Sequence, residues 1–294
     1  MNYMISSYAD NMDKLRYYSS MFSRKILNDI LVYDDFSKLK ETIHNFDIDN
    51  QWNGKTYLDY YQYLYAILQR NYQCEYVYKN EIISKYLIKV FSHKDTIAFS
   101  EFHVNQSIAD LVLFNGTSRA YEIKTEYDSD KRLQHQLADY CKLFELCFLV
   151  TSIDKVSYYE GLLPEQVGII AINFKNQAPR FSTLKNAIAN QKIDIDTLMQ
   201  SVRTNEYINI TRYVCGKVPD VSIFDMYEAC RDMLHHEEND KVRKAFKKEI
   251  KKRKSSSTYI PNYAECLRQM CLAINIQPSS YNVLFEKLNH KILI

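Results

Sequence analysis

IADLVLFNGTSRAYEIK, at residues 108–124, is the segment from which the architecture of this chain can be inferred. Its first part is a nearly continuous apolar run and its last part alternates between polar and apolar residues, so each part predicts a β-strand. Asn115 and Gly116 between them favour a tight turn, because both tolerate backbone angles that other residues avoid. The segment therefore predicts two antiparallel strands joined by a short loop.

The sequence around this hairpin predicts more strands and a helix. Three strands are expected from apolar runs with strand-like composition: IAFSEFHV (97–104), LCFLVTS (146–152) and VGIIAINF (167–174). Residues 129–145 have apolar side chains at helical spacing, with Asp128 or Ser129 as the expected N-cap. The order of helices, three strands, a helix, two strands and helices predicts an α/β fold with a mixed β-sheet flanked by helices.

The remaining sequence is helical in pattern and divides the chain into three regions. We expect a helical N-terminal region at 1–78, an α/β core at 79–178 and a helical C-terminal region at 179–294. The core is expected to begin with a helix over residues 79–92. Three serines at 255–257 follow a basic run and predict a mobile loop.

Composition limits the classes of protein that this chain can belong to. The 38 basic and 36 acidic residues give a net charge of +2, so contact with nucleic acid has to come from a local basic cluster. The 7 cysteines show no zinc-ligand spacing and are expected to be reduced thiols. No signal-like segment and no apolar run of about 18 residues is present. We expect a soluble, cytoplasmic protein without a membrane partner.

Two acidic residues of the hairpin suggest chemistry. A carboxylate in an apolar strand is costly to bury unless it is paired, hydrogen-bonded or bound to a metal, so Asp110 is either structural or functional. Glu122 and Lys124 lie two residues apart on one strand face, while Tyr121 and Ile123 are expected to face the core. The same pattern fits an ordinary charge pair on a solvated strand face, so the tripeptide by itself is a weak signal.

The turn decides whether these carboxylates meet. If residues 115–117 form a three-residue loop, Phe114 pairs with Ser118 and Asp110 lies opposite Glu122. Paired side chains lie about 5 Å apart at Cβ, so the two carboxylates would repel each other. A divalent cation, Mg²⁺ or Mn²⁺, would remove this repulsion. A two-residue loop would instead place the carboxylates on opposite faces.

Asp110, the short hairpin and Glu122-x-Lys124 together resemble the PD-(D/E)xK nuclease superfamily. Ala109 stands where the superfamily pattern has Pro, which is a departure from that pattern. The resemblance implies a restriction-endonuclease-like fold and a Mg²⁺-dependent enzyme that hydrolyses DNA. It also implies roles: Asp110 and Glu122 bind the metal, and Lys124 assists the attacking water or stabilises the developing charge.

The following helix extends the resemblance. Gln136 and Tyr140 are one helical turn apart and are similar to the QxxxY motif of RecB-like exonucleases, which implies that both shape the catalytic site. The superfamily often adds an acidic residue from the helix before the first strand, and Glu81 fits that position. Over residues 80–175 the pattern resembles an uncharacterised bacterial group of nuclease-like proteins. Tyr140 as a core aromatic, Gln136 as a surface residue and Glu81 as an ordinary helix residue remain the alternatives.

One strongly basic segment stands apart from this core. Residues 241–254 carry nine basic side chains and one acidic one, which fits a helix along a nucleic-acid backbone. A solvated helix, offset by the acidic residues just before it, fits the same pattern. The candidate nucleic-acid-binding residues are Lys131, Arg132, Lys247, Lys248 and Lys251.

The leading hypothesis is a Mg²⁺-dependent nuclease acting on DNA in phage defence, a mobile element or repair. The alternative is a module that keeps the fold but only binds nucleic acid or a protein partner. A purely helical interaction protein is a third reading. RNA as the substrate, and a homodimer or a partner protein, stay open. The sequence contains none of the motifs GxxxxGK[ST], GxSxG and HExxH, which argues against a P-loop, an α/β-hydrolase and a zincin.

Overall fold

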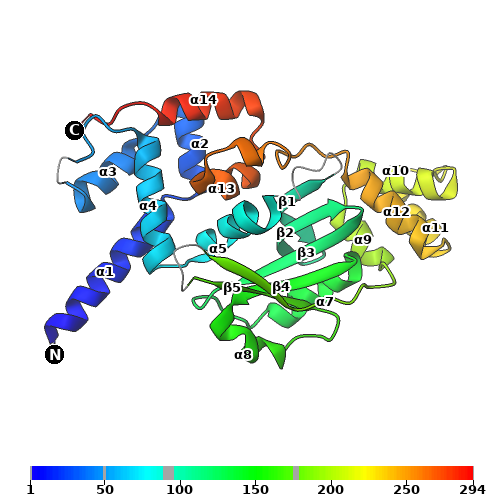
Figure 1. The fold of residues 1–294 in the computed structure, drawn as a ribbon. Coiled ribbons are helices and arrows are strands. Elements are labelled where there is room, and N and C mark those ends of the chain that lie inside the picture. The colour runs from blue at the N-terminus through cyan, green and yellow to red at the C-terminus, as the bar shows by residue number, and fades with distance from the viewer. Residues whose placement is uncertain (1, 49–50, 89–95, 175–178, 294) are drawn as a thin grey trace. The chain divides into compact units, whose positions relative to one another are not determined.

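A computed structural model describes residues 2–48, 51–88, 96–174 and 179–293 (Figure 1). Backbone contacts divide the chain into a helical unit, Met1–Ser92 with Ser256–Ile294, and a sheet unit, His93–Ser255. These units cut across the three regions suggested by the sequence pattern, because the last helices belong to the helical unit. No helix in the described residues is both long and apolar enough to span a bilayer.

The sheet unit is built on one six-stranded sheet whose strands lie in sequence order. The first two pairings are antiparallel, the next two parallel and the last antiparallel, so the expected mixed sheet is confirmed. The strands are β1 (Ile97–Val104), β2 (Ser107–Asn115), β3 (Thr117–Lys124), β4 (Leu146–Ser152), β5 (Gly168–Asn173) and β6 (Arg180–Lys185).

The sixth strand corrects the sequence interpretation, which treated the chain from about residue 181 as helical. β6 pairs with β5 at the edge of the sheet, and its side chains are exposed or half-buried. An edge strand of this kind has no continuous apolar face and therefore gives little periodic signal.

The β2–β3 hairpin has the expected register. Phe114 pairs with Ser118 and Asn115 with Thr117 around Gly116, whose φ of +67° is easily adopted by glycine. One alternative for β3 is excluded. The sequence left open a solvated strand face that carries Glu122 and Lys124, but Tyr121 to Lys124 are all buried because β3 is a central strand with both faces covered.

Helices and one cluster of aromatic rings form the core of the sheet unit. Phe102, Phe114 and Phe144 meet with ring centroids about 6 Å apart, and Phe246 packs edge-on against Phe114 at 5.8 Å. This cluster joins β1, β2 and the last helix of the unit. The helices are α7 (Leu133–Leu143), η2 (Ile153–Lys155), α8 (Val156–Glu160), α9 (Ile195–Ser201), α10 (Thr204–Cys215), α11 (Met226–His235) and α12 (Asn239–Ile250).

Two local expectations around these helices are corrected. α7 begins at Leu133 and has no side-chain cap, because the Asp128 carboxylate accepts hydrogen bonds from the backbone N–H and hydroxyl of Thr125 instead. The serine run at 255–257 is not a loose loop: Ser256 and Ser257 are buried, and Ser256 donates its hydroxyl to the Cys271 carbonyl.

The helical unit joins the two ends of the chain. Residues 54–56 pair with the C-terminal segment, since Gly54 N–H donates to the Ile292 carbonyl and Ile292 N–H donates to Lys55. The helix expected over 79–92 is present as far as Ile88, and residues 89–92 lie outside the described residues. The elements are α1 (Asn2–Ser20), α2 (Arg24–Tyr33), α3 (Ser37–Phe46), α4 (Tyr57–Asn71), α5 (Glu75–Glu81), the π-helical η1 (Ile82–Leu87), η3 (Ile260–Asn262), η4 (Glu265–Leu267), α13 (Arg268–Ala273) and α14 (Pro278–Leu288).

A buried carboxylate organises the N-terminal helices. Asp47, at the end of α3, accepts hydrogen bonds from the hydroxyls of Tyr18 at 2.8 Å, Tyr60 at 2.7 Å and Tyr63 at 3.2 Å. Lys14 lies 3.6 Å away from the same carboxylate. Three of the 25 tyrosines thus tie α1, α3 and α4 together through one acceptor.

Replacing this acceptor is expected to destabilise the helical unit. Asp47→Ala leaves buried tyrosine hydroxyls without a partner, which costs about 3 kcal/mol in the free energy of unfolding. Urea unfolding can be followed by the fluorescence of Trp52, the single tryptophan, which is 3 % exposed and lies 4.8 Å from the Tyr60 ring. Asp13→Ala is the matched control, because Asp13 pairs with Arg16 on the surface. Equal stability of the two variants would contradict the central role of Asp47.

Candidate active site

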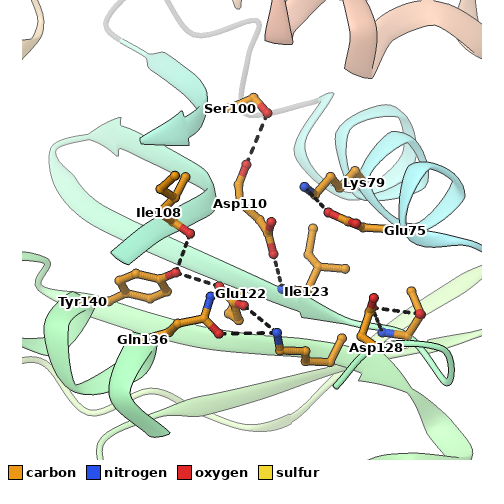
Figure 2. A network of polar contacts seen from close by, with 12 residues as sticks. Glu75, Lys79, Ser100, Ile108, Asp110, Glu122, Ile123, Asp128, Gln136 and Tyr140 are labelled. Carbon is orange, nitrogen blue, oxygen red and sulfur yellow. Dashed lines mark hydrogen bonds and ion pairs between the residues drawn. The ribbon is translucent and has the colours of Figure 1, made fainter. Parts of the chain in front are cut away.

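Three elements of the sheet unit bring the hairpin carboxylates and the α7 side chains to one place (Figure 2). Glu122 and Lys124 come from β3, Asp110 from β2, and Gln136 and Tyr140 from α7. Residues 136 and 140 lie one helical turn apart, so both side chains project from the same face of α7 toward β3. The structure therefore brings together all five residues that the sequence named as the catalytic group.

Glu122 is the centre of this group. Its carboxylate is 2 % exposed, with Lys124 Nζ 3.0 Å from Oε1 and Tyr140 Oη 2.8 Å from Oε2. Lys124 Nζ also donates to Gln136 Oε1 at 3.4 Å. A buried charge is tolerated when it is both paired and hydrogen-bonded, and Glu122 meets both conditions. Its ionisation still remains costly.

Burial raises the pKa of Glu122 to about 7, and the charge of Asp110 adds to the rise. Lys124 and the Tyr140 hydroxyl oppose it by favouring the ionised form. The contribution from Asp110 means that the two carboxylates are near enough to repel each other, as the hairpin register suggested. A carboxyl group with a pKa near neutrality is typical of sites that bind cations or transfer protons.

Tyr140 links this carboxyl to the edge of the hairpin. Its hydroxyl oxygen lies 2.8 Å from Glu122 Oε2 and 2.7 Å from the Ile108 carbonyl oxygen, but it has only one proton to donate. When Glu122 is protonated, the carboxyl donates to Tyr140 and Tyr140 donates to Ile108, which satisfies both contacts. When Glu122 is ionised, Tyr140 donates to it. The hydroxyl thus accommodates both protonation states.

Asp110 lies where β2 departs from regular pairing. One carboxylate oxygen accepts the backbone N–H of Ile123 at 2.8 Å, and its backbone carbonyl accepts the Ser100 hydroxyl at 3.3 Å. The pairing of β1 with β2 runs from Ser100–Leu111 to Phe102–Ala109 and skips Glu101, whose φ is +55°. A left-handed glutamate inside a strand is strained, and such strain clusters at functional sites.

These residues fit a hard divalent cation. Mg²⁺ is commonly held by one or two carboxylates while it keeps several waters, and Asp110 with Glu122 offers that donor set. Within the described residues there is no group of three or more His, Cys, Asp or Glu side chains able to hold a metal. A divalent ion held by these two carboxylates would keep several of its waters.

The remaining predicted residues have other surroundings. Glu81 belongs to the helical unit, where burial raises its pKa and its carboxylate accepts hydrogen bonds from Tyr65 and Gln69. Its role as a third metal ligand stays a prediction. Lys131 and Arg132 are exposed and precede α7, whereas the sequence had suggested that they lie in its first turn.

The three lysines of α12 have unequal roles. Lys247 donates to the Gly116 carbonyl at 2.7 Å and pairs with Glu145 at 2.9 Å, so it fastens α12 to the hairpin tip. Lys248 is exposed and lies over the ring of Tyr213, 4.3 Å from its centroid. Lys251 is half-buried and lines a groove beside that tip.

Some features of the site could not be found from the sequence. Glu101 was a weaker candidate for the additional acidic residue, but nothing in the sequence of β1 indicates its left-handed conformation, which favours glycine or asparagine. Ser100, whose hydroxyl donates to the Asp110 carbonyl, carried no signal. α7 also carries a buried carboxylate, Asp139, which accepts hydrogen bonds from Ser107 and Asn105 at the β1–β2 turn. No signal in the sequence indicated its burial.

Comparison with known proteins gives a family match and two more limited likenesses. A family model described as bacteriophage P4 protein cII matches residues 69–278. Protein cII of Enterobacteria phage P4 is 32 % identical over 77 residues, which are 26 % of this chain and 29 % of that protein. The alignment therefore spans less than a third of the relative's length.

The solved structures add one likeness. A protein of unknown function from Silicibacter pomeroyi is 15 % identical, with 49 % of this chain and 92 % of that chain covered and a TM-score of 0.30. A TM-score at this level supports no argument about fold or function. The descriptions of these proteins state no activity.

Charge neutralisation at Asp110 is expected to change the ionisation of Glu122. Asp110→Asn removes a repelling charge and lowers the pKa of Glu122, whereas Lys124→Met removes an attracting charge and raises it. Carbon-13 NMR of glutamate side-chain carboxyls measures both shifts. Glu165→Gln, at an exposed position, is the control and should leave the titration unchanged. Identical titrations in all variants would show that the three groups do not interact.

The raised pKa also predicts how stability depends on pH. Because Glu122 holds its proton more tightly when folded than when unfolded, its contribution to stability is complete below about pH 4.5 and is lost as the pH rises through about 7. The loss is about 3 kcal/mol in the absence of divalent ions. The free energy of unfolding is measured in urea with EDTA at pH 5 and pH 8. That of Glu122→Gln should increase relative to wild type at the higher pH. No relative gain would mean that Glu122 is not buried in this way.

Proposed function

This chain belongs to the family of bacteriophage P4 protein cII, and we propose that it is a metal-dependent nuclease that hydrolyses the phosphodiester bonds of DNA. The family description states no activity, so the proposal rests on the site. The observation that carries it is the buried Glu122 carboxylate, with a pKa near 7, held between Lys124, Tyr140 and the charge of Asp110.

The arrangement favours a functional over a structural reading of the hairpin. Burial would raise the pKa of a structural carboxylate too, but at Glu122 the charge of a second carboxylate, Asp110, adds to the rise. The second carboxylate, Asp110, contributes to that rise and so acts against stability. Charged groups that destabilise one another while they converge on one point are typical of catalytic sites.

Asp110 and Glu122 would hold the cation, Mg²⁺ or Mn²⁺. Such an ion supplies Lewis-acid polarisation of a phosphate oxygen and a lower pKa for water. Binding at this point would also favour the ionised form of Glu122, since a positive charge offsets the repulsion from Asp110. The residues therefore fit the ion both in donor type and in charge.

The other side chains have roles that their contacts support. Lys124 has its ammonium group held by Glu122 and Gln136, which directs a positive charge toward a phosphate placed beside the carboxylates. There it would stabilise negative charge developing on the phosphate or orient the attacking water. Tyr140 and Gln136 are positioning residues, because Tyr140 orients Glu122 and Gln136 orients Lys124.

The sheet also has features that a restriction-endonuclease-like fold would have. An antiparallel hairpin carries both carboxylates, and α7 then connects β3 to the parallel strand β4. The relative named in the family comparison is from a bacteriophage, which makes a phage or other mobile-element setting the favoured context. We propose that the sheet unit has a restriction-endonuclease-like fold and that the protein acts in such a setting.

A cleavage assay tests the proposal directly. Wild-type protein with Mg²⁺ or Mn²⁺ is expected to cut linear or circular DNA, and Asp110→Ala and Lys124→Ala each to lose at least about a hundredfold in rate, because each removes a group that acts on the transition state. Omitting the metal, or adding EDTA, should abolish cutting.

Matched controls separate this activity from contamination and from misfolding. Glu160→Gln and Lys155→Ala change exposed charges of the same unit and should leave cleavage intact. Circular dichroism must show that all variants are folded. If wild type and the Asp110 and Lys124 variants cut equally, the site is not catalytic. If none cuts but all bind DNA, the chain is a binding module.

A further inference from the structure

Two grooves flank the exposed side of α12. The hairpin groove, of about 460 Å³, is lined by Phe114, Asn115, Gly116, Lys244, Lys247, Lys248 and Lys251. The tyrosine groove, of about 280 Å³, is lined by Asn209, Arg212, Tyr213, Ala245, Lys248, Glu249 and Lys252. Lys248 lines both grooves, so they adjoin along one side of the helix.

The basic side chains of this segment divide into structural and exposed ones. Arg253 binds Glu206 through two nitrogens at 2.6 Å, and Lys247 is held by Glu145. By contrast, Lys244, Lys248 and Lys251 line the hairpin groove, and none of the three forms an ion pair with another described residue. Three positive charges on one short surface without acidic partners fit a ligand with repeated negative charges.

Arg243 adds a second, independent observation. It lies one helical turn before Lys247 and is 8 % exposed, and its Nε and Nη2 atoms have no hydrogen-bond partner among the described residues. A buried guanidinium with unsatisfied donors is costly, and an anion is the group that would satisfy it. α12 therefore carries a buried guanidinium with unsatisfied donors in addition to its exposed lysines.

The tyrosine groove indicates which polyanion fits. Tyr213 is 53 % exposed, and Lys248 lies over its ring at 4.3 Å. An exposed aromatic ring interleaved with lysines provides both stacking for a base and charge for a phosphate, which is the combination that nucleic-acid surfaces use. An acidic peptide would need the lysines only, so the aromatic ring favours nucleic acid.

The grooves lie on the same face of the sheet as the candidate active site but at the other end of the hairpin. Phe114 of β2, Ala120 of β3, Tyr140 of α7 and Phe246 of α12 belong to one buried apolar cluster, and Phe114 packs against Phe246. Gly116, which lines the hairpin groove, is six residues from Asp110, a distance of about 20 Å at the usual rise of a strand. Figure 1 shows α10, α11 and α12 gathered together away from α8.

From this geometry we propose that α12 and the hairpin tip form a second contact for the nucleic-acid substrate, separate from the catalytic centre. Since a duplex rises 3.4 Å per base pair, a substrate that touches both places spans about six base pairs. Shorter molecules reach only one of them. The proposal rests on the proposed function and adds to it a preference for substrate length and the position of the contact that sets this preference.

Binding without cleavage tests the contact. Fluorescence anisotropy in EDTA compares a hairpin DNA with a 5-base-pair stem and one with a 20-base-pair stem. Wild type is expected to bind the longer stem at least tenfold more tightly, with an affinity that falls steeply with salt. Lys244→Ala/Lys248→Ala/Lys251→Ala is expected to lose this tenfold gain, and the slope of log K against log salt should decrease by about 2 to 3 because three phosphate contacts are removed.

Two controls make the result specific to position and charge. Lys25→Ala/Lys40→Ala/Lys155→Ala removes three exposed positive charges elsewhere and should bind as wild type does. Lys244→Arg/Lys248→Arg/Lys251→Arg keeps the charge and should restore the tenfold gain. If the alanine variant at α12 keeps the length dependence, or the distant variant loses it equally, the proposal is overturned.

Failure of the proposed α12 contact can be distinguished from failure of the proposed nuclease activity. If Asp110→Ala still shows the length-dependent binding and no variant cuts DNA, the α12 contact stands and the catalytic proposal fails. If wild type cuts DNA but the α12 alanine variant has an unchanged KM on the 20-base-pair stem, the α12 contact fails and the nuclease stands. Tight binding of poly-glutamate that displaces the 20-base-pair stem would show that the grooves accept acidic protein chains, which would overturn the choice of nucleic acid.

Discussion

The ionic and hydrogen-bonded contacts of Glu122 are the constraint on which the candidate site depends. A carboxylate that is nearly inaccessible to water needs partners, and Lys124 and Tyr140 are held within 3.0 Å of its two oxygens. Tyr140 can reach it only if α7 lies across the face of β3. The apolar positions of α7, such as Leu133 and Leu137, and the small Ala120 on β3 allow this close approach. Packing and chemistry therefore specify the same position for α7.

The departure of β1 and β2 from regular pairing also positions a carboxylate of the candidate site, that of Asp110. In a regular ladder, Asp110 would pair with Glu101, between the pairs Ser100–Leu111 and Phe102–Ala109. Instead, Glu101 takes a left-handed conformation, the Ser100 hydroxyl binds the Asp110 carbonyl, and the Asp110 carboxylate reaches the backbone of Ile123. The strain at one residue is compensated by hydrogen bonds at its neighbours. The result is a carboxylate positioned by the backbone of the strand that carries Glu122.

α12 shows how one basic segment can serve structure and surface together. Lys247 and Arg253 use their charges within the sheet unit, on Glu145 and Glu206, while Phe246 inserts into the aromatic cluster under the hairpin. These contacts fasten the helix to the tip of the same hairpin whose base carries Asp110. A rigid hairpin thus connects the candidate catalytic centre with the basic grooves. Lys244, Lys248 and Lys251 line the hairpin groove, so the basic run combines structural positive charges with exposed ones.

The sequence by itself indicated the hairpin and the five residues of the candidate group, and it limited the register to two alternatives, because these depend on short-range properties. Turn chemistry at Asn115-Gly116, alternation along β3 and the helical spacing of Gln136 and Tyr140 each involve residues only a few positions apart. Only the tertiary structure decided the burial of both faces of β3, the edge strand β6, the left-handed Glu101 and the roles of the α12 lysines. These depend on neighbours distant in sequence: Lys247 meets Glu145, 102 residues away, and β3 is buried because strands and helices from elsewhere cover it. Local patterns carry no information about such partners, because the free energy of a buried charge or an edge strand is set by what packs against it.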